Sequence, residues 1–299
     1  MPRVRANAID IAYESLGRQG DPTILLIHGL ATPLTGWPDS LCEGLIRRGF
    51  RVVRFDNRDI GRSTFFDALG IPDIGAMMAA LQSGRRPIPP YPLDAMAADA
   101  AGLMDALGIV RAHMVGASMG GMIAQLVALN HPERTASLVS IVSSTGRPGL
   151  APGKPEAMRA LMAMPASPAR ADRLATAVAA VKAISGQGFP QTDAELVAYL
   201  GRSIDATPYD PPAAARHMAA VICAPPRHER LKEVRVPALV IHGSDDLVLP
   251  PAHGEDTANS IHGAKLIVVP GMGHDFKEAL MPVWIEAIGD FAARAQKPL

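Results

Sequence analysis

The hexapeptide GASMGG at residues 116–121 is the stretch whose residue types most directly suggest chemistry. It follows an apolar run and precedes a helical pattern at residues 122–129, so Ser118 stands at a predicted strand-to-helix turn. This is the pattern of a nucleophile elbow, in which a side chain two residues from the strained serine would collide with it. Glycine at positions 116 and 120 avoids that collision. The pattern predicts a nucleophilic hydroxyl at Ser118.

Two other interpretations of the hexapeptide need to be weighed. A glycine-rich turn in an ordinary β-α unit fits it equally well, because G-x-S-x-G occurs often by chance. A phosphate-binding loop is excluded, since no Gly-Lys-Ser/Thr follows and Ser118 stands where G-x-G-x-x-G has its middle glycine. The choice depends on whether the chain supplies a base, an acid and an oxyanion hole in the right order.

Two later strand ends offer the base and the acid that a serine nucleophile needs. His274 stands in the glycine-containing loop at residues 270–276, directly after the last predicted strand. Asp245 and Asp246 are adjacent in the loop after the strand before it. The strand at residues 137–142 is followed by Ser-Ser-Thr and has no carboxylate there. The resulting order of serine, aspartate and histidine is that of hydrolases with a nucleophile elbow.

The oxyanion hole needs two N–H donors, each worth on the order of 3–4 kcal/mol when lost. Met119, directly after the nucleophile, is predicted to supply one, and its side chain is a candidate wall of the pocket. Leu30 is predicted to supply the other, from the His-Gly-Leu loop after the strand at residues 24–27. Gly29 would let that loop bend inward.

The remaining candidate ligands are interpreted as structural. His28, His242 and His253 fit backbone-bonded residues at strand ends, and residues 253–256 (HGED) fit a solvated face. No His-x-x-x-His spacing occurs, so we expect neither a metal nor a cofactor. The polar loop at residues 56–63 (DNRDIGRS) is interpreted as a turn whose aspartates and arginines pair with one another.

The elements around these residues alternate between strand and helix. Predicted strands cover residues 8–16, 24–27, 52–55, 113–115, 137–142, 237–241 and 265–269, and predicted helices cover residues 37–48, 94–107, 122–129 and 283–295. Such alternation favours a parallel sheet with right-handed crossovers. Residues 64–92 form an irregular connection with one short predicted helix at residues 74–81.

The composition changes after residue 145, where the chain becomes rich in Ala, Met and Pro without a clear strand. Four helices are predicted there, at residues 156–164, 169–184, 193–203 and 213–221. We therefore expect a core domain at residues 1–145 and 234–299 and a helical cap at residues 146–233. A helical block inserted there would cover the carboxyl ends of the strands, where ligands bind in such sheets.

Composition narrows the classes of partner. The 299-residue chain has 29 Lys and Arg against 29 Asp and Glu, which argues against nucleic acid or an anionic membrane as partner. Two cysteines make no disulfide framework, and neither a signal peptide nor a membrane span is evident. We expect a cytoplasmic protein with a small-molecule substrate; its oligomeric state is open, and a homodimer is compatible with the sequence.

These motifs, in this order, resemble the α/β-hydrolase fold family over nearly the whole chain. The resemblance implies a mostly parallel eight-stranded sheet with an inserted helical cap. In the family motif the catalytic acid stands four residues before a proline, here Pro250, which selects Asp246 over Asp245. Within the family the chain looks most like aclacinomycin methylesterase and related serine carboxylesterases. The shared features are Trp37-Pro38-Asp39, the DNRDIGRS loop and the PGMGH run ending at His274.

The resemblance implies hydrolysis of a carboxylic ester through an acyl-enzyme. The longer connection at residues 64–92 argues against transferring the relatives' polyketide methyl-ester specificity, so a small-to-medium, mainly apolar ester is expected. Candidate pocket residues, each of which also fits core packing, are Trp37, Met158, Met162, Met218, Val248 and Phe276. A lactonase, a carbon–carbon bond hydrolase and a cofactor-free perhydrolase remain alternatives on the same residues, with a non-hydrolysing ligand receptor less favoured.

Overall fold

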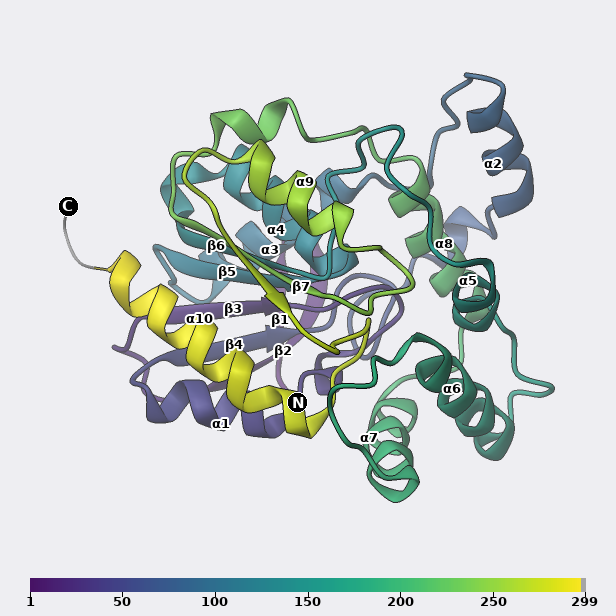
Figure 1. The fold of residues 1–299 in the computed structure, drawn as a ribbon, viewed down its shortest axis with the longest axis horizontal. Coiled ribbons are helices and arrows are strands. Elements are labelled where there is room, and N and C mark those ends of the chain that lie inside the picture. The colour runs from purple at the N-terminus through teal and green to yellow at the C-terminus, as the bar shows by residue number, and fades with distance from the viewer. Residues whose placement is uncertain (297–299) are drawn as a thin grey trace.

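A computed structural model describes residues 1–296 and has one eight-stranded sheet at its centre (Figure 1). The strands are β1 (Arg3–Ala6), β2 (Ile9–Leu16), β3 (Thr23–Ile27), β4 (Arg51–Phe55), β5 (Ala112–Ala117), β6 (Thr135–Ile141), β7 (Ala238–Gly243) and β8 (Lys265–Val269). Their order in the sheet is β1-β2-β4-β3-β5-β6-β7-β8. β2 pairs antiparallel with β1 and β4, and all other pairs are parallel. The mostly parallel eight-stranded sheet is confirmed.

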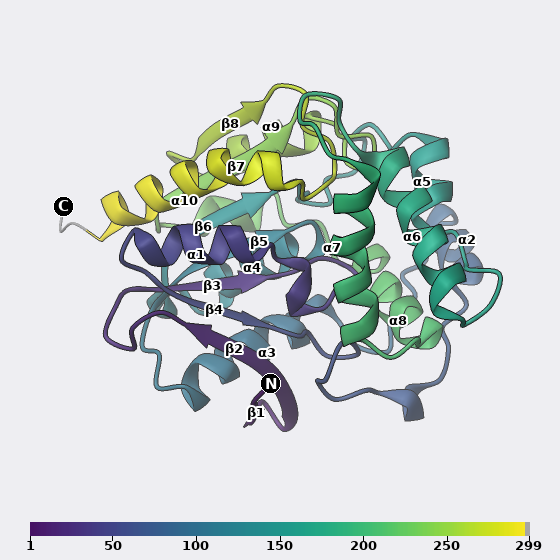
Figure 2. The ribbon, with the colours of Figure 1, turned by 90° about the horizontal axis from the view of Figure 1, so that it is seen from below.

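Helices cover both faces of the sheet (Figure 2). α1 (Asp39–Arg47) and α10 (Met281–Ala295) pack together on one face, and α3 (Leu93–Ala106) and α4 (Met119–Asn130) on the other. All five residues of β3 are buried, so side chains on both faces of the sheet have to be covered by helices. Leu25 and Ile27 join the core under α3 and α4, whereas Ile24 and Leu26 join the core under α1 and α10.

Two elements, β1 and α9, were not predicted from the sequence. β1 is short and mostly exposed, and it exists through antiparallel pairing with residues Ile9 to Ala12 of β2. α9 (Ala252–Ser260), which packs against β7 and β8, has a weakly amphipathic sequence rich in polar residues. Both elements depend on tertiary contacts that a local pattern does not contain. Short 3₁₀ turns are η1 (Leu34–Gly36), η2 (Asp67–Leu69), η3 (Pro132–Arg134), η4 (Arg230–Glu233) and η5 (Glu278–Leu280).

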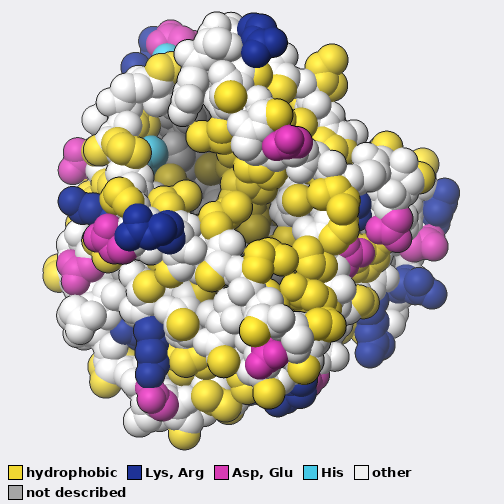
Figure 3. All heavy atoms as spheres, turned by 90° about the vertical axis from the view of Figure 1, so that its right-hand side faces the viewer, with side chains coloured by type: hydrophobic (Ala, Val, Ile, Leu, Met, Phe, Trp, Pro, Cys, Tyr) yellow, Lys and Arg dark blue, Asp and Glu magenta, His cyan; other side chains and the backbone are white. Residues whose placement is uncertain are grey.

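Four helices lie between β6 and β7, close to the predicted ranges. They are α5 (Pro155–Leu161), α6 (Arg170–Ile184), α7 (Asp193–Ala206) and α8 (Pro211–Ile222). A capping box of Thr192 and Glu195 starts α7, and Asp210 caps α8. α2 (Ile74–Gln82) packs beside α8. Figure 3 looks onto this side of the molecule, whose surface is hollowed and rich in hydrophobic side chains. The division into core and cap stays a prediction.

The turn around Ser118 depends on close backbone contacts. β5 ends at Ala117, α4 begins at Met119, and Ser118 has a φ of 56° between them. A Cβ on Gly116 would lie 2.0 Å from the carbonyl oxygen of Gly120, and a Cβ on Gly120 would lie 2.0 Å from that of Ile27. Glycine is therefore required where the sequence predicted it. The predicted collision with Ser118 itself is wrong, because the colliding atoms belong to the following helix and to β3.

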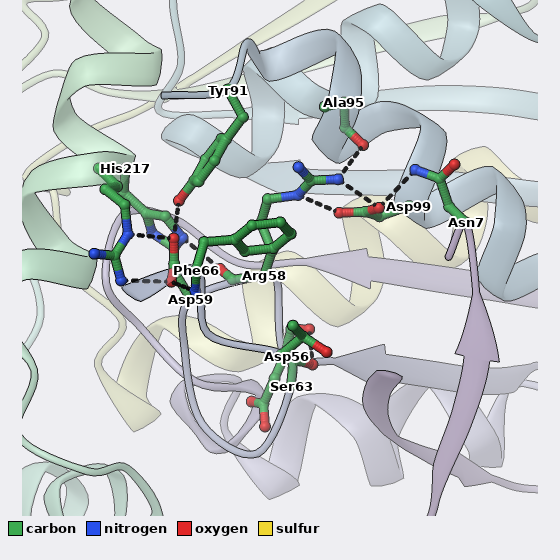
Figure 4. Close-up of polar contacts among 12 residues, drawn as sticks. Asn7, Asp56, Arg58, Asp59, Ser63, Phe66, Tyr91, Ala95, Asp99 and His217 are labelled. Atoms are coloured by element: carbon green, nitrogen blue, oxygen red, sulfur yellow. Dashed lines mark hydrogen bonds and ion pairs between the residues drawn. The ribbon is translucent and has the colours of Figure 1, made fainter. Parts of the chain in front are cut away.

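The polar loop at residues 56–63 ties the core to α8 through buried ion pairs. Asp59 and Arg216 form a bidentate pair at 2.7 and 2.8 Å, and both side chains are 0% exposed. Arg58 pairs with Asp99 of α3 at 2.6 and 2.8 Å. The hydroxyl of Tyr91 also donates to Asp59, at 2.6 Å (Figure 4). The loop thus joins segments as expected, but the prediction that its own charges pair with one another is wrong.

Substitution of Asp59 tests the ion pair. Burial by itself would raise the pKa of Asp59, but hydrogen bonds from Arg216 and Tyr91 hold it below its ordinary value of 3.8. Asp59→Asn leaves the buried Arg216 with only the exposed carboxylate of Asp67, 3.3 Å away, as counter-charge. The free energy of unfolding at pH 7 should therefore fall by about 3 kcal/mol. A depressed folded-state pKa gives stability that is present above pH 3.8 and lost as the pH falls through the folded-state pKa. The difference in free energy of unfolding between the wild type and Asp59→Asn, measured with urea, should therefore shrink as the pH falls below 3.8.

The matched control for this prediction is Asp105→Asn. Asp105 pairs with Arg134 on the surface, and its side chain is 66% exposed. Removing that pair should cost less than about 1 kcal/mol at any pH. Equal losses for the two variants would contradict the role given to the buried pair.

Gly120→Ala tests the turn itself. The added methyl group meets the backbone of Ile27, which cannot rotate away, so we expect a loss of about 1–3 kcal/mol in the free energy of unfolding. Gly20→Ala is the control, because a Cβ on Gly20 has no neighbour within 4 Å. An unchanged urea midpoint for Gly120→Ala would refute the close contact between the elbow and β3.

Candidate active site

The structure brings Ser118, Asp246 and His274 together at the carboxyl ends of β5, β7 and β8. The Oγ of Ser118 lies 3.0 Å from Nε2 of His274, and Nδ1 of His274 lies 2.8 Å from Oδ2 of Asp246. Asp246 and His274 are buried, and Ser118 is partly exposed. The three side chains form one continuous chain of hydrogen bonds that ends at a solvent-accessible hydroxyl.

The carboxylate of Asp246 is held from two sides. Its Oδ1 accepts the backbone N–H groups of Val248 at 2.9 Å and Leu249 at 2.8 Å. Burial by itself would raise the pKa of Asp246, but His274 and the N–H of Leu249 hold it below its ordinary value. Asp245 faces elsewhere, since its Oδ1 accepts the hydroxyl of Ser244 at 2.7 Å. Of the two neighbouring aspartates, Asp246 is the one that contacts the histidine.

The loop that carries His274 is held by the end of α6. The backbone N–H of His274 donates to the carbonyl oxygen of Ile184 at 2.9 Å. A Cβ on Gly273 would lie 2.2 Å from the backbone nitrogen of Gly186, so the two segments touch through glycines. The position of the imidazole thus depends on the helices between β6 and β7 as well as on β8.

The two predicted oxyanion donors belong to segments next to Ser118, the start of α4 and the loop after β3. A Cβ on Gly29 would lie 3.2 Å from Cβ of Ser118, so the loop after β3 passes close to the serine. Within residues 1–296, neither the N–H of Leu30 nor that of Met119 donates a hydrogen bond to another protein group. Both N–H groups are therefore free for an external acceptor. The side chain of Met119 is buried in the core under α3 and α4, so its predicted place in the pocket wall is wrong.

A cavity of about 520 Å³ opens above Ser118 and His274. Most of its walls are apolar side chains from α6, α7, α8 and the segment at residues 160–165. Three predicted pocket residues, Met162, Met218 and Phe276, line it. Leu30 lines it as well, beside the two catalytic candidates. The cavity therefore lies between the sheet and the helices inserted after β6.

Three other predicted pocket residues do not line this cavity. Trp37 is fully buried and packs against the rings of His28, Phe276 and Trp284, with centroids 5.0 to 6.5 Å apart. Met158 and Val248 pack into a small apolar cluster with Ala157 and Ile184. They fill core space, which is the interpretation that the sequence had left open for each of them.

The sequence analysis missed one face of α6. Thr176, Ala177, Ala180, Val181 and Ile184 all line the cavity, and their spacing is that of a single helical face. Periodicity could have grouped them, but it could not have shown that this face meets a cavity rather than a neighbouring helix. The charged residues of the lining were missed too; these are Asp59, Arg173, Asp210 and Asp275.

The other histidines are held by hydrogen bonds. Nδ1 of His28 accepts the N–H of Gly29 at 2.7 Å, and burial lowers the pKa of His28 to about 3. Nε2 of His242 lies 2.7 Å from the carbonyl oxygen of Leu249. His253 is buried rather than on a solvated face, because its ring nitrogens contact Ser144 and Ala151 at 2.8 and 2.9 Å. The structural role near a strand end is confirmed for His28 and His242. His253 is structural too, but it lies in α9 rather than at a strand end, and the solvated face is wrong for it.

Within residues 1–296, no group of three or more His, Cys, Asp or Glu side chains is arranged to hold a metal ion. No helix among these residues has the length and apolar character needed to cross a membrane.

Comparison with known proteins places the chain in a family. Residues 22–278 match the family described as alpha/beta hydrolase fold. The chain is 31% identical to rhodomycin D methylesterase DnrP from Streptomyces peucetius over 282 residues, 87% of each protein. It is 29% identical to a 2-hydroxy-6-oxononadienedioate/2-hydroxy-6-oxononatrienedioate hydrolase from Burkholderia vietnamiensis, over 88% of this chain and 84% of that protein.

The fold comparison agrees with the sequence comparison. The crystal structure of the enol-lactonase from Burkholderia xenovorans superposes with a TM-score of 0.72 at 23% identity, covering 98% of this chain and 100% of that chain. At this identity the likeness concerns the fold alone. The sheet order, the strand-end positions of Ser118, Asp246 and His274, and the family match agree with one another. The chain belongs to the α/β-hydrolase fold family and is a hydrolase.

Proposed function

We propose that this hydrolase cleaves carboxylic esters through an acyl-enzyme formed on Ser118. The observation that carries the proposal is the hydrogen-bonded series from Ser118 Oγ through His274 to Asp246, with distances of 3.0 and 2.8 Å. A serine hydroxyl becomes a useful nucleophile only when a base takes its proton, and this series supplies that base and its orienting carboxylate. The similarity to a methylesterase supports the same class of reaction.

The proposed reaction has two halves. Ser118 Oγ attacks the ester carbonyl carbon while Nε2 of His274 takes its proton, and Nδ1–H of His274 donates to Asp246 throughout. The N–H groups of Leu30 and Met119 bind the oxyanion of the tetrahedral intermediate. The alcohol leaves with the proton from His274. Water, deprotonated by His274, then attacks the acyl-enzyme. His274 returns that proton to Ser118 Oγ as the bond to the acyl group breaks, and the acid is released.

The lining of the cavity favours a neutral, mainly apolar ester. Of the charged side chains in its lining, Asp59 is paired with Arg216 and Asp275 with Lys277. That leaves the carboxylate of Asp210 and the guanidinium of Arg173. That guanidinium already donates to the carbonyl oxygens of Ile204 and Thr207 and lies 5.3 Å from the Tyr209 ring. A doubly anionic acid, such as the one in the name of the Burkholderia relative, would meet little positive charge here.

Substitution of the proposed nucleophile tests the reaction. Ser118→Ala should lower kcat for p-nitrophenyl butyrate by about 10⁴-fold or more, because no acyl-enzyme can form. Asp246→Asn should lower kcat strongly as well, since the imidazole loses the carboxylate that holds its tautomer. Asp245→Asn is the control and should keep most of the activity, because Asp245 does not contact His274. Steady-state release of p-nitrophenol, with circular dichroism to show intact folding, measures all three.

A wider panel of substrates, each followed by its own product, separates ester hydrolysis from its rivals. A panel of p-nitrophenyl esters, aliphatic lactones and acetate with hydrogen peroxide distinguishes an esterase from a lactonase and a perhydrolase. Full activity of Ser118→Ala would refute the acyl-enzyme. A wild-type protein that binds these esters without turnover would instead indicate the ligand-receptor alternative.

A further inference from the structure

We propose that His217 of α8 is a positioning residue for the oxyanion hole, and this inference rests on the proposed function. His217 contacts neither Ser118 nor the other two members of the hydrogen-bonded series. It contacts the loop that carries Leu30, through the next residue, Ala31. A helix from the segment inserted after β6 thereby holds the loop after β3 that carries the backbone donor.

The loop at Ala31 needs such support because its backbone is strained. Ala31 has a φ of 50°, a left-handed conformation that costs a residue with a Cβ on the order of 1–3 kcal/mol. Its N–H donates to Nδ1 of His217 at 3.1 Å. Strained backbone persists only where surrounding contacts define it, and this hydrogen bond is such a contact. The hydrogen bond holds the peptide group between Leu30 and Ala31. The peptide group that carries the N–H of Leu30 is the next one back along the chain, so this contact restrains it through the backbone of Leu30 alone.

The partners of His217 allow only one protonation state. The carbonyl oxygen of Arg58 lies 2.6 Å from Nε2 and can only accept, so Nε2 carries the proton. The N–H of Ala31 can only donate, so Nδ1 is unprotonated. Burial of the ring lowers the pKa of His217, which keeps this neutral tautomer in place. The ring thus links two loops of the core, the one after β3 and the one after β4.

Hydrogen bonds next to His217 hold the helix that carries its ring and the loop after β3 that the ring contacts. Arg216, one residue before His217, is anchored by its ion pair with Asp59 and donates to the carbonyl oxygen of Gly70 at 3.1 Å. In Figure 4, His217 lies beside Asp59 and above the loop that contains Arg58. On the other side, Asn57 donates to the carbonyl oxygen of His28 at 3.1 Å. The loop after β3 is therefore held at both ends while the N–H of Leu30 remains free.

The hydrogen bond between Ala31 and His217 also joins the loop of the oxyanion hole to a helix that lines the cavity. Met218 and Ala214 of α8 line the cavity, whereas His217 points away from it, toward the core loops. A substrate group that contacts Ala214 or Met218 therefore contacts the same helix whose His217 accepts the hydrogen bond from Ala31. His217 supports the donor without touching the substrate.

Two substitutions of His217 separate its two hydrogen bonds. His217→Asn places an acceptor near the position of Nδ1 and keeps the bond to Ala31, but it loses the donor to Arg58. His217→Gln places a donor near the position of Nε2 and keeps the bond to Arg58, but it loses the acceptor for Ala31. Removal of an oxyanion donor costs about 10²–10³-fold in kcat. Since Leu30 would be loosened rather than removed, we expect His217→Gln to lose about 10- to 100-fold in kcat with KM changed less than about threefold.

The expected pattern differs from that of a purely structural histidine. His217→Asn should keep kcat within about fivefold of the wild type. His217→Gln alone should bind a phenylboronic acid inhibitor more weakly, and its loss of affinity should be proportional to its loss of kcat. His113→Gln is the control. His113 is buried, contacts Ser137 at 2.8 Å, and lies near the amino end of β5, away from the site. It should change thermal stability without changing boronic acid affinity.

Hydrogen exchange gives a readout that does not require turnover. Amides of the peptide at residues 28–34 should exchange faster in His217→Gln than in His217→Asn or the wild type. Equal exchange and equal kcat in the two variants would overturn the role of His217, whatever their stability. Absence of ester turnover by the wild-type protein would refute the proposed function instead, and the exchange measurement would still decide whether His217 holds the loop.

Discussion

Close contact of three backbone segments around Ser118 is the constraint on which the site depends. The carbonyl oxygen of Ile27 lies where a Cβ on Gly120 would be, and Gly29 passes just above the serine. Because no side chains separate these segments, β3, β5 and α4 fix one another's positions. Leu30 and Met119, whose N–H groups have no acceptor within the described residues, belong to these segments or follow them directly. Any change that separates the segments would move the nucleophile and both donors together.

The helices inserted after β6 are part of this arrangement and do more than cover it. Ile184 at the end of α6 accepts a hydrogen bond from the backbone of His274, and His217 of α8 accepts one from Ala31. The ion pair between Asp59 and Arg216 anchors α8 to the core without exposure to water. A fully buried ion pair is a weak source of net stability but a strong determinant of geometry, because only one arrangement satisfies both charges. The cavity walls and the proposed catalytic groups are therefore coupled.

The fold and the reacting side chains were largely predictable because their signals are local. Apolar runs bounded by turn residues indicated seven of the eight strands, and the family resemblance supplied the expected total. Ser118 follows β5 directly, and Asp246 and His274 stand in the loops that leave β7 and β8, so the parallel sheet brings all three to one edge. The pocket was less predictable. Trp37 and Met162 were both candidate pocket residues, yet Trp37 is buried in the core and Met162 lines the cavity.

The order of serine, aspartate and histidine and the glycines of the elbow could be recognised from short segments of the chain, because each belongs to a local motif. The choice of Asp246 came from the resemblance to the family motif. The partners of the charged and aromatic side chains, by contrast, depend on how distant segments pack together. Asp59 meets Arg216 across 157 positions, and Ala31 meets His217 across 186. Such pairs form when α8 docks on the core, and no local pattern encodes the direction in which a buried side chain then points.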